Sequence, residues 1–370
     1  MKILITGGAG FIGSHIVDAV AEKHEVVVLD NLEPQVHTRG RPDYLNENAT
    51  YLFGDVRDNA VLRRALEGAE VVFHEAAAVG VGQSMYQVER YVEVNTMGTA
   101  KLLDILVNEE HEVKKLIVAS SMSIYGEGAY DCRDCGMVYP KLRAEKQLKG
   151  GEWEMRCPNC NKIVKPIPTS EIKPLHPTSI YASTKRDQEE MCLSIGRTYG
   201  IPTVALRYFN VYGPRQSLNN PYTGVCAIFS ARIKNNNPPM IFEDGLQSRD
   251  FISVHDIVEA NILAMERSSA DYEVFNVGTG KAVSILEVAK ALMRLYNKEI
   301  EPEITNNYRA GDIRHCFADI SMIKNKLGFE PKVTFEEGIK ELVAWGEQEE
   351  AIDKFDMAHE ELKEKGLVGR

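Results

Sequence analysis

Residues 1–13 read Met1-Lys2-Ile3-Leu4-Ile5-Thr6-Gly7-Gly8-Ala9-Gly10-Phe11-Ile12-Gly13. The apolar run over 2–6 contains β-branched residues and stops at glycines, which predicts a short buried strand followed by a tight turn. From Phe11 onward the apolar spacing becomes helical. A strand, a glycine turn and a helix N-terminus in this order present free backbone N–H groups, so the stretch predicts a binding site for a pyrophosphate.

A second buried strand over 25–29 ends in Asp30-Asn31. An acid at this position holds the ribose 2′-hydroxyl of a dinucleotide, and its charge repels the additional phosphate of NADP. The glycine spacing, Gly-x-x-Gly-x-x-Gly, carries little weight without this context. Together the two features predict NAD as the cofactor, and glycines that serve only a turn are the alternative.

The alternation of strand and helix continues along the chain. Further buried strands are predicted over 49–55, 70–74 and 115–121, and helices over 13–23, 59–67 and 91–109. Continuous apolar strands that alternate with helices predict an α/β fold with a doubly wound parallel sheet. Ligands of such sheets bind beyond the carboxyl ends of the strands, so Asp55, Ala76 and Ser121 are expected to line one crevice.

The composition indicates an ordinary globular protein, with 370 residues of which 44% are hydrophobic and 26% charged. The formal net charge of −11 argues against a partner that is nucleic acid or an anionic membrane surface. No apolar run in the sequence approaches the length of a membrane span, and no basic leader precedes the first strand. We therefore expect a cytoplasmic protein without nucleic-acid or membrane partners.

The segment 128–164 interrupts the alternation and is charged and poor in apolar residues. It contains two Cys-x-x-Cys pairs, and each pair can present two thiolates to one tetrahedral ion. This predicts a zinc-ribbon-like insert whose zinc is structural, because four thiolates leave no coordination position for water or substrate. Iron, redox-active cysteines and a metal-free loop are the alternatives. The four predicted ligands are Cys132, Cys135, Cys157 and Cys160.

Tyr181 and Lys185 lie one turn apart on a helix predicted to run to about residue 199. A tyrosine can act as a base near neutral pH if a neighbouring ammonium group favours the phenolate. An isolated Tyr-x-x-x-Lys is more often a surface pair. The cofactor site and Ser121 at a strand end favour the catalytic interpretation here.

Several motifs together resemble the extended short-chain dehydrogenase/reductases that act on nucleotide sugars, over nearly the whole chain to about residue 345. The resemblance implies a Rossmann sheet with a smaller C-terminal substrate domain, and a homodimer formed through the helices near 91–109 and 181–199. The motifs are Gly7-Gly8-Ala9-Gly10-Phe11-Ile12-Gly13, Asp55-Val56, Ser120-Ser121, Tyr125-Gly126, Tyr181-x-x-x-Lys185, Arg207-Tyr208-Phe209-Asn210-Val211-Tyr212-Gly213-Pro214 and Arg249-Asp250-Phe251-Ile252.

The resemblance also implies roles for individual residues. Tyr181 would be the base, Lys185 its electrostatic partner and a ribose contact, and Ser121 the hydroxyl that binds the sugar oxygen. Cofactor contacts are implied at Gly7, Gly10, Phe11, Ile12, Gly13, Asp30, Asn31, Asp55, Val56, Ala76, Ala77, Ala78, Asn95, Tyr181, Lys185 and Tyr208. Substrate contacts are implied at Ser84, Ser121, Met122, Tyr181, Asn210, Arg249, Arg309, Asp312 and Cys316, with the two arginines on the diphosphate.

The residues after Ser121 indicate the reaction. Dehydratases and decarboxylases of the family carry an acid shortly after the serine, whereas this chain has Met122 and Ser123, which cannot act as general acid or base. The sequence is therefore most similar to the 4-epimerases of the UDP-galactose and dTDP-L-rhamnose type. These enzymes act through reversible hydride transfer at C4 and a 4-keto intermediate. A related sugar-nucleotide oxidoreductase and a non-catalytic NAD-binding protein are the alternatives.

Four segments are expected. Residues 1–127 and 165–205 form the dinucleotide-binding domain, 128–164 the insert, 206–345 mainly the sugar-nucleotide domain, and 346–370 a solvated C-terminal helix without a chemical role. Four positions beyond Asp312 the epimerases often carry a tyrosine that excludes N-acetylated sugars. This chain has Cys316 there, which would leave room for a larger sugar.

Overall fold

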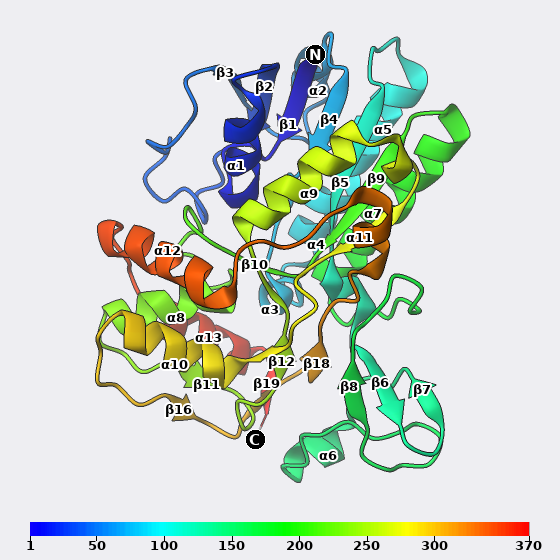
Figure 1. The fold of residues 1–370 in the computed structure, drawn as a ribbon. Helices are drawn as coiled ribbons and strands as arrows, with labels where there is room; N and C mark the ends of the chain where they lie inside the picture. The colour runs from blue at the N-terminus through cyan, green and yellow to red at the C-terminus, as the bar shows by residue number, and fades with distance from the viewer. Residues whose placement is uncertain (370) are drawn as a thin grey trace.

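The computed structural model describes residues 1–369. Seven parallel strands form the central sheet in the order β14-β9-β5-β4-β1-β2-β3 (Figure 1). The chain runs outward from β1 to β3 and then returns to β4 beside β1, so ligands are expected beyond the carboxyl ends of β1 and β4. This confirms the predicted doubly wound sheet. The strands are β1 Lys2–Thr6, β2 Glu25–Asp30, β3 Ala49–Phe53, β4 Val71–His74, β5 Lys115–Ser121, β9 Thr203–Tyr208 and β14 Val274–Val277.

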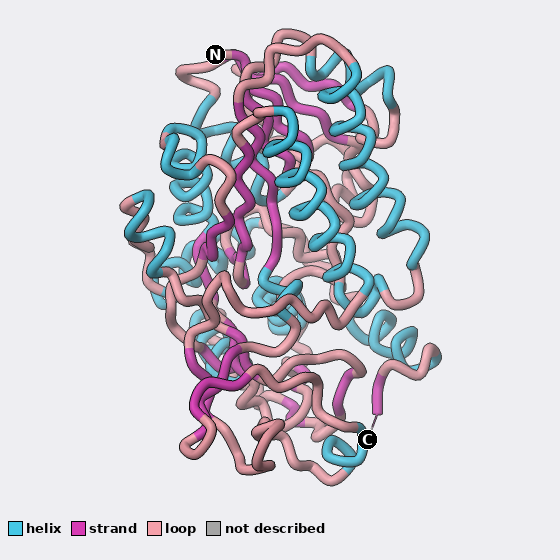
Figure 2. Tube along the Cα trace, turned by 90° about the vertical axis from the view of Figure 1, so that its right-hand side faces the viewer, coloured by secondary structure: helices cyan, strands magenta, loops and turns pink. Residues whose placement is uncertain are grey.

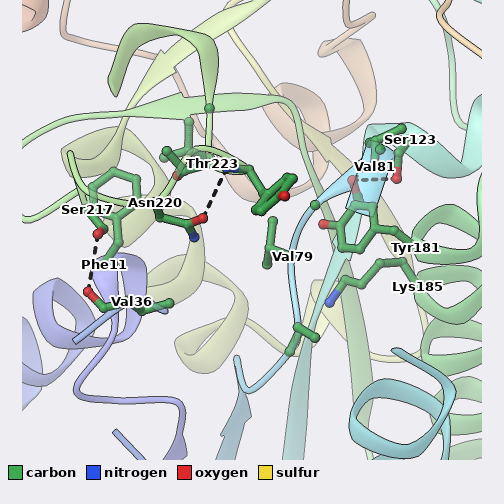
Figure 3. Close-up of a pocket in the computed structure, with 18 of the residues that line it drawn as sticks. Phe11, Val36, Val79, Val81, Ser123, Tyr181, Lys185, Ser217, Asn220 and Thr223 are labelled. Carbon is green, nitrogen blue, oxygen red and sulfur yellow. Dashed lines mark hydrogen bonds between the residues drawn. The ribbon is translucent and has the colours of Figure 1, made fainter. Parts of the chain in front are cut away.

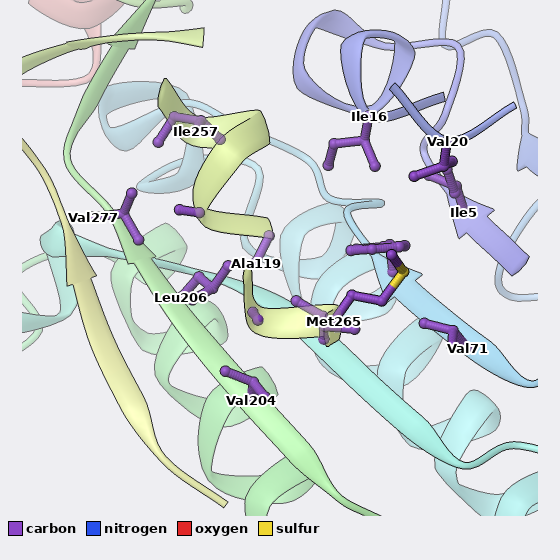
Figure 4. Packing of buried hydrophobic residues seen from close by; sticks show 14 of the residues in the cluster. Ile5, Ile16, Val20, Val71, Ala119, Val204, Leu206, Ile257, Met265 and Val277 are labelled. Carbon is purple, nitrogen blue, oxygen red and sulfur yellow. The ribbon is translucent and has the colours of Figure 1, made fainter. Parts of the chain in front are cut away.

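Helices cover both faces of the sheet (Figure 2). In one apolar layer, Ile5 and Val71 of the sheet belong to the same buried cluster as Ile16 and Met265 of the helices above it (Figure 4). Because both faces are buried, the strands are apolar on both sides, which explains their continuous hydrophobic runs. One face packs against α1 Phe11–Val20, α9 Val254–Glu266 and α11 Ser321–Leu327, and the other against α2 Asn59–Leu66, α5 Gly98–Asn108 and α7 Ile180–Tyr199.

The helix predicted over 91–109 is irregular. It consists of α4 Val88–Tyr91, the π-helical segment η1 Val92–Met97 and α5. Asn95 in η1 is fully buried, and its amide accepts a hydrogen bond from Ala78 N (2.7 Å) and donates one to Ala78 O (3.0 Å). The π-helical turn therefore holds the loop that follows β4, in keeping with the frequent occurrence of such turns at functional sites.

A second lobe packs below the carboxyl edge of the sheet (Figure 1). Its apolar core joins α8 Val225–Lys234, α10 Ile285–Leu295 and α12 Phe335–Gln348. Within the range 346–370, for which a C-terminal helix is predicted, α12 ends at Gln348 and a separate helix, α13 Phe355–Glu364, follows with one buried face. The small strands of this lobe are β10 Asn210–Tyr212 with β13 Phe251–Ser253, β11 Met240–Ile241 with β16 Glu303–Ile304, β12 Ser248–Arg249 with β15 Val283–Ser284 and β18 His315–Cys316, and β17 Tyr308–Arg309 with β19 Val368–Gly369.

The cysteine-containing segment forms a separate three-stranded sheet in the order β7-β6-β8. Its elements are β6 Ala129–Cys132, β7 Gly136–Val138, α6 Glu145–Lys149 and β8 Lys165–Ile167. The remaining short helices of the chain are α3 Val81–Ser84, η2 Met122–Tyr125 and η3 Ser268–Ala270. Throughout residues 1–369, every helix is too short or too polar to span a bilayer.

His74 at the end of β4 is expected to make the fold sensitive to acid. It is 1% exposed and hydrogen-bonds the Thr6 and Thr99 hydroxyls, each at 2.8 Å, and burial lowers its pKa to about 3. An unfolded histidine has a pKa of about 6.5, so the stability that neutral His74 contributes is complete above that pH and is lost as pH falls toward 3. Urea unfolding at pH 7 and pH 4.5 should show a smaller pH effect for His74→Gln than for the wild type.

Exposed His255 provides the control for this experiment. His255→Gln should retain the wild-type pH dependence of the unfolding free energy. An equal pH dependence in the wild type and in His74→Gln would show that His74 is not responsible.

Candidate active site

A cavity of about 600 Å³ lies at the carboxyl edge of the sheet and is lined by residues of both the sheet and the C-terminal lobe. Most of the residues predicted to contact the cofactor or the substrate line it. The predicted residues that line it are Gly7, Gly10, Phe11, Ile12, Gly13, Asp30, Asn31, Asp55, Val56, Ala76, Ala77, Ala78, Ser121, Met122, Tyr181, Lys185, Tyr208, Asn210, Arg249, Arg309 and Asp312.

The glycine turn forms one wall of the cavity. Gly7 has a φ of +72°, and a Cβ at this position would lie 2.8 Å from the Ala76 backbone nitrogen, so a side chain would separate the turn from the β4 loop. Helix α1 begins at Phe11 after Gly10, and no side chain caps it. Its first N–H groups are therefore free to bind an anion, and the turn fits the pyrophosphate of a dinucleotide.

Two acids stand beside this turn. The Asp30 carboxylate accepts hydrogen bonds from Ala9 N (3.0 Å) and Leu32 N (2.8 Å), which fixes its position at the end of β2. Asp55 accepts hydrogen bonds from Arg57 and from the Asn31 amide (3.0 Å). The hydrogen bond from Arg57 lowers the pKa of Asp55 to about 2, so Asp55 is ionised at neutral pH.

Tyr181 and Lys185 lie side by side at one end of the cavity (Figure 3). Ser179 caps α7 by accepting a hydrogen bond from Ala182 N (3.1 Å), and Ser84 Oγ accepts one from Tyr181 N (3.0 Å). These contacts fix the start of the helix that carries both side chains. Ser121 reaches the same place from the end of β5, although the insert separates it from Tyr181 along the chain.

Burial is the largest influence on the pKa values of Tyr181 and Lys185. It raises the pKa of Tyr181, an effect that the nearby Ser121 hydroxyl opposes, and it lowers the pKa of Lys185 to about 8. Lys185 alone therefore does not produce the lowered tyrosine pKa that the Tyr-x-x-x-Lys spacing suggested. Burial also raises the pKa of Glu75 to about 7, and its carboxylate accepts a hydrogen bond from Tyr208 (2.9 Å). A cation near the phenol would favour the phenolate.

Two arginine side chains also line the cavity. The Arg249 guanidinium donates hydrogen bonds to the carbonyl oxygens of Ile313 (2.7 Å) and Arg314 (3.0 Å). Arg309 donates to Asp312 Oδ2 at 2.8 Å. Two arginines on one wall can accommodate a diphosphate.

Three of the predicted contact residues do not line the cavity. Asn95 accepts a hydrogen bond from the backbone nitrogen of Ala78, and Ser84 accepts one from the backbone nitrogen of Tyr181, so both hold residues that line the cavity. Cys316 is 1% exposed and packs with Met122 in a small apolar cluster, because the pairing of β18 with β12 turns its side chain away from the cavity. The expectation that Cys316 enlarges the sugar site is therefore not supported by its position.

The sequence matches two family profiles. The profile of the NAD dependent epimerase/dehydratase family matches residues 3–141, and that of GDP-mannose 4,6 dehydratase matches residues 163–342. A dTDP-L-rhamnose 4-epimerase of Burkholderia thailandensis is 37% identical over 352 residues, which cover 94% of this chain and 95% of the relative. The chain belongs to the NAD dependent epimerase/dehydratase family.

Solved structures agree with this assignment. A UDP-glucose 4-epimerase from Thermotoga maritima, solved with UDP-glucose, has 35% identity and a TM-score of 0.76, and the match covers 94% of this chain and 99% of that one. A UDP-glucose 4-epimerase from Thermus thermophilus, solved with NAD, has 31% identity and a TM-score of 0.72 with the same coverage. Membership in the NAD dependent epimerase/dehydratase family confirms the resemblance that the sequence motifs indicated, and the chain is an enzyme.

Several cavity residues were not predicted. Glu75 directly follows strand β4, and this position at a strand end is the feature of the sequence that could have identified it as a cavity residue. Three others carry a polar atom that is buried and has no hydrogen-bond partner in the described chain. These atoms are Gln216 Oε1, Gln247 Oε1 and His359 Nδ1, together with Oδ1 of the predicted residue Asn210.

The four predicted metal ligands meet in the insert. The sulfur atoms of Cys132, Cys135, Cys157 and Cys160 all lie within 4.8 Å of one another, and those of Cys132 and Cys160 are 3.5 Å apart. Four thiolates at about 2.3 Å from a tetrahedral zinc ion would be separated by about 3.8 Å. The arrangement therefore fits a closed Cys₄ site.

Proposed function

We propose that this protein is an NAD-dependent 4-epimerase of nucleoside-diphosphate sugars. The observation that carries the proposal is the convergence of Ser121, Tyr181 and Lys185 beside the glycine turn, in a cavity that Arg249 and Arg309 also line. Acid side chains are absent from the two positions after Ser121, where Met122 and Ser123 stand. This favours a reaction of hydride and proton transfer alone.

Each of these side chains has a proposed role. Bound NAD would accept the hydride from C4 of the sugar and return it. Tyr181 takes the proton of the C4 hydroxyl and gives it back, while the Ser121 hydroxyl holds the sugar oxygen. Lys185 stabilises the phenolate and binds the cofactor ribose. The two arginines hold the diphosphate, so the 4-keto sugar can present its other face without leaving the site.

The substrates named for the relatives suggest which sugars to test. Incubation of the purified protein with UDP-glucose, UDP-N-acetylglucosamine or dTDP-L-rhamnose, without added NAD(P)H, should yield the C4 epimer of one of them. Stoichiometric reduction of added NAD, with a keto sugar and no epimer as product, would instead identify an oxidoreductase with net hydride transfer. A protein that binds NAD but converts none of the three would not support an epimerase of this substrate class.

We also propose that the insert holds a structural zinc ion through its four cysteines. The spacing of the sulfur atoms and the all-thiolate donor set support this assignment. Within the described chain the insert has a small apolar cluster of its own, which a closed metal site would stabilise.

The chain is further proposed to form a homodimer through the α4–α5 and α7 surface. Val88, Val92 and Met97 are 41–50% exposed along the irregular helix, as expected for residues that a second copy would cover. Light scattering coupled to gel filtration should give twice the chain mass of 41.4 kDa. Val92→Glu should shift the species toward the monomer, and a monomeric wild type would contradict the proposal.

A further inference from the structure

The arginine loop, residues 309–314, joins β17 to β18 and forms part of the cavity wall. The cysteine-containing insert, residues 128–164, contacts this loop and lies beside β18 (Figure 1). None of the described residues 128–164 lines the cavity itself. The insert therefore touches the back of a loop whose other residues face the cavity.

The arginine loop fixes the orientation of Arg249. The Arg249 guanidinium donates hydrogen bonds to the carbonyl oxygens of Ile313 (2.7 Å) and Arg314 (3.0 Å) in the loop, and to that of Ser248 (2.8 Å). Within residues 1–369 these bonds use one N–H of Nη2 and both of Nη1, so Nε and the second Nη2 hydrogen are left for a ligand. A shift of the loop would turn these remaining N–H groups away from a bound diphosphate.

Arg143 of the insert holds the same loop. Its Nη2 donates to the Asp312 carbonyl oxygen (3.3 Å), and its Nη1 donates to the Trp153 carbonyl oxygen (3.0 Å) within the insert. The two nitrogens also form a bidentate pair with Glu243, at 2.9 and 2.7 Å. Arg143 is 8% exposed and Glu243 is 2% exposed. One buried guanidinium thus joins the insert, the arginine loop and the segment that follows β11.

Asp312 links Arg143 to the cavity wall. Its carboxylate accepts a hydrogen bond from Arg309 (2.8 Å), and its carbonyl oxygen accepts one from Arg143 and from no other group in residues 1–369. The end of the loop has separate support, because the Glu127 carboxylate accepts a hydrogen bond from Arg314 N (2.7 Å). Loss of the Arg143 contact should therefore loosen the loop around Asp312 and leave β18 in place.

We propose that Arg143 is a positioning residue of the substrate site, which holds the arginine loop so that Arg249 and Arg309 present their N–H groups to the diphosphate of the nucleotide sugar. The inference rests on the proposed function, because that function identifies the diphosphate as the ligand. It gives the insert a role in substrate binding besides its role in stability. Since Arg143 does not contact the glycine turn, its replacement should leave NAD binding unchanged.

Calorimetric titration of the full-length, NAD-loaded protein with inorganic pyrophosphate tests this role. Arg143→Lys keeps the charge beside Glu243, but the lysine side chain ends one bond short of the guanidinium nitrogens and cannot reproduce the fork that also reaches Asp312. The variant should bind pyrophosphate about 5-fold more weakly than the wild type. The NAD content of the purified variant should equal that of the wild type.

The same variant should show a matching change in kinetics. With the nucleotide sugar identified by the incubation assay, KM should rise by about the same factor while kcat stays near the wild-type value, because the lost interaction affects binding alone. Arg156→Lys is the matched control, since Arg156 pairs with Glu152 (2.8 Å) inside the insert. It should bind pyrophosphate like the wild type.

Wild-type pyrophosphate affinity in Arg143→Lys would overturn the positioning role, and so would an equal loss of bound NAD, which would indicate a general distortion. Arg249→Gln should abolish pyrophosphate binding. If it does not, or if the wild type binds no pyrophosphate, the proposed arginine site and the role of Arg143 both fail. The titrations require no turnover, so a protein that shows the expected affinities but yields no epimer would retain this role and contradict the proposed reaction instead.

Discussion

Tyr181→Phe should lower the rate of C4 epimerisation by about 10²–10⁴-fold, the usual contribution of a positioned proton-transfer group. The substitution removes only the phenolic oxygen from a side chain whose helix start is fixed by Ser84 and Ser179. Phenylalanine also keeps the edge-on packing against Tyr91, whose ring centre is 6.5 Å away. The variant should therefore fold normally and bind NAD, and the initial rate with the identified nucleotide sugar measures the effect.

Tyr199 offers the matched control, because it lies at the end of the same helix and is 52% exposed. Tyr199→Phe should turn over at the wild-type rate. Substantial epimerisation by Tyr181→Phe, with NAD still bound, would remove Tyr181 from the proposed role.

Cys157→Ser should abolish zinc binding and lower the free energy of unfolding by about 3–5 kcal/mol. Without its ion the insert has only a small apolar cluster to hold it together. Two side chains of the insert form ion pairs with residues outside it. Glu154 pairs at 2.5 Å with the fully buried Arg314, which directly precedes β18. Arg143 pairs at 2.7 Å with Glu243. Disorder of the insert would take Arg143 away from the buried Glu243, which is the reason for the size of the effect, whereas Arg314 would keep its pairs with Glu243 and Asp244.

Metal analysis of the purified wild type should give one zinc ion per chain, and urea unfolding of both proteins gives the stability difference. Met137→Ser, an exposed position in the same hairpin, should retain the zinc and the wild-type stability. A wild type purified without zinc, or a Cys157→Ser variant of unchanged stability, would contradict the structural role.

The sequence predicted those parts of the site that depend on local geometry. Strand β5 covers residues 115–121 as predicted. Strand ends in a parallel sheet share one edge, so the order of residues along the chain was enough to place Ser121 and Asp55 in one crevice. Tyr181 and Lys185 were recognisable because their spacing is itself a helical contact.

Other features depend on contacts between distant segments. Glu75 stands at a strand end, but its partner Tyr208 is 133 residues away in sequence. The register of β18 against β12 decides that Cys316 faces an apolar cluster, and a count from Asp312 cannot reveal that orientation. Helix α13 has the charged pattern typical of a solvated helix, because only a narrow face of it is buried. That face contacts the ring of Phe242, which comes from another part of the chain.

In the proposed reaction one hydride leaves C4 and returns to the same carbon within a single bound complex. The nucleotide sugar identified by the incubation assay should therefore be labelled with deuterium at C4 and incubated in ordinary water, with unlabelled NADH added to the solution. We expect the epimeric product to keep the deuterium at C4, as read by mass spectrometry and NMR. Loss of the label to water or to the added NADH would contradict the account.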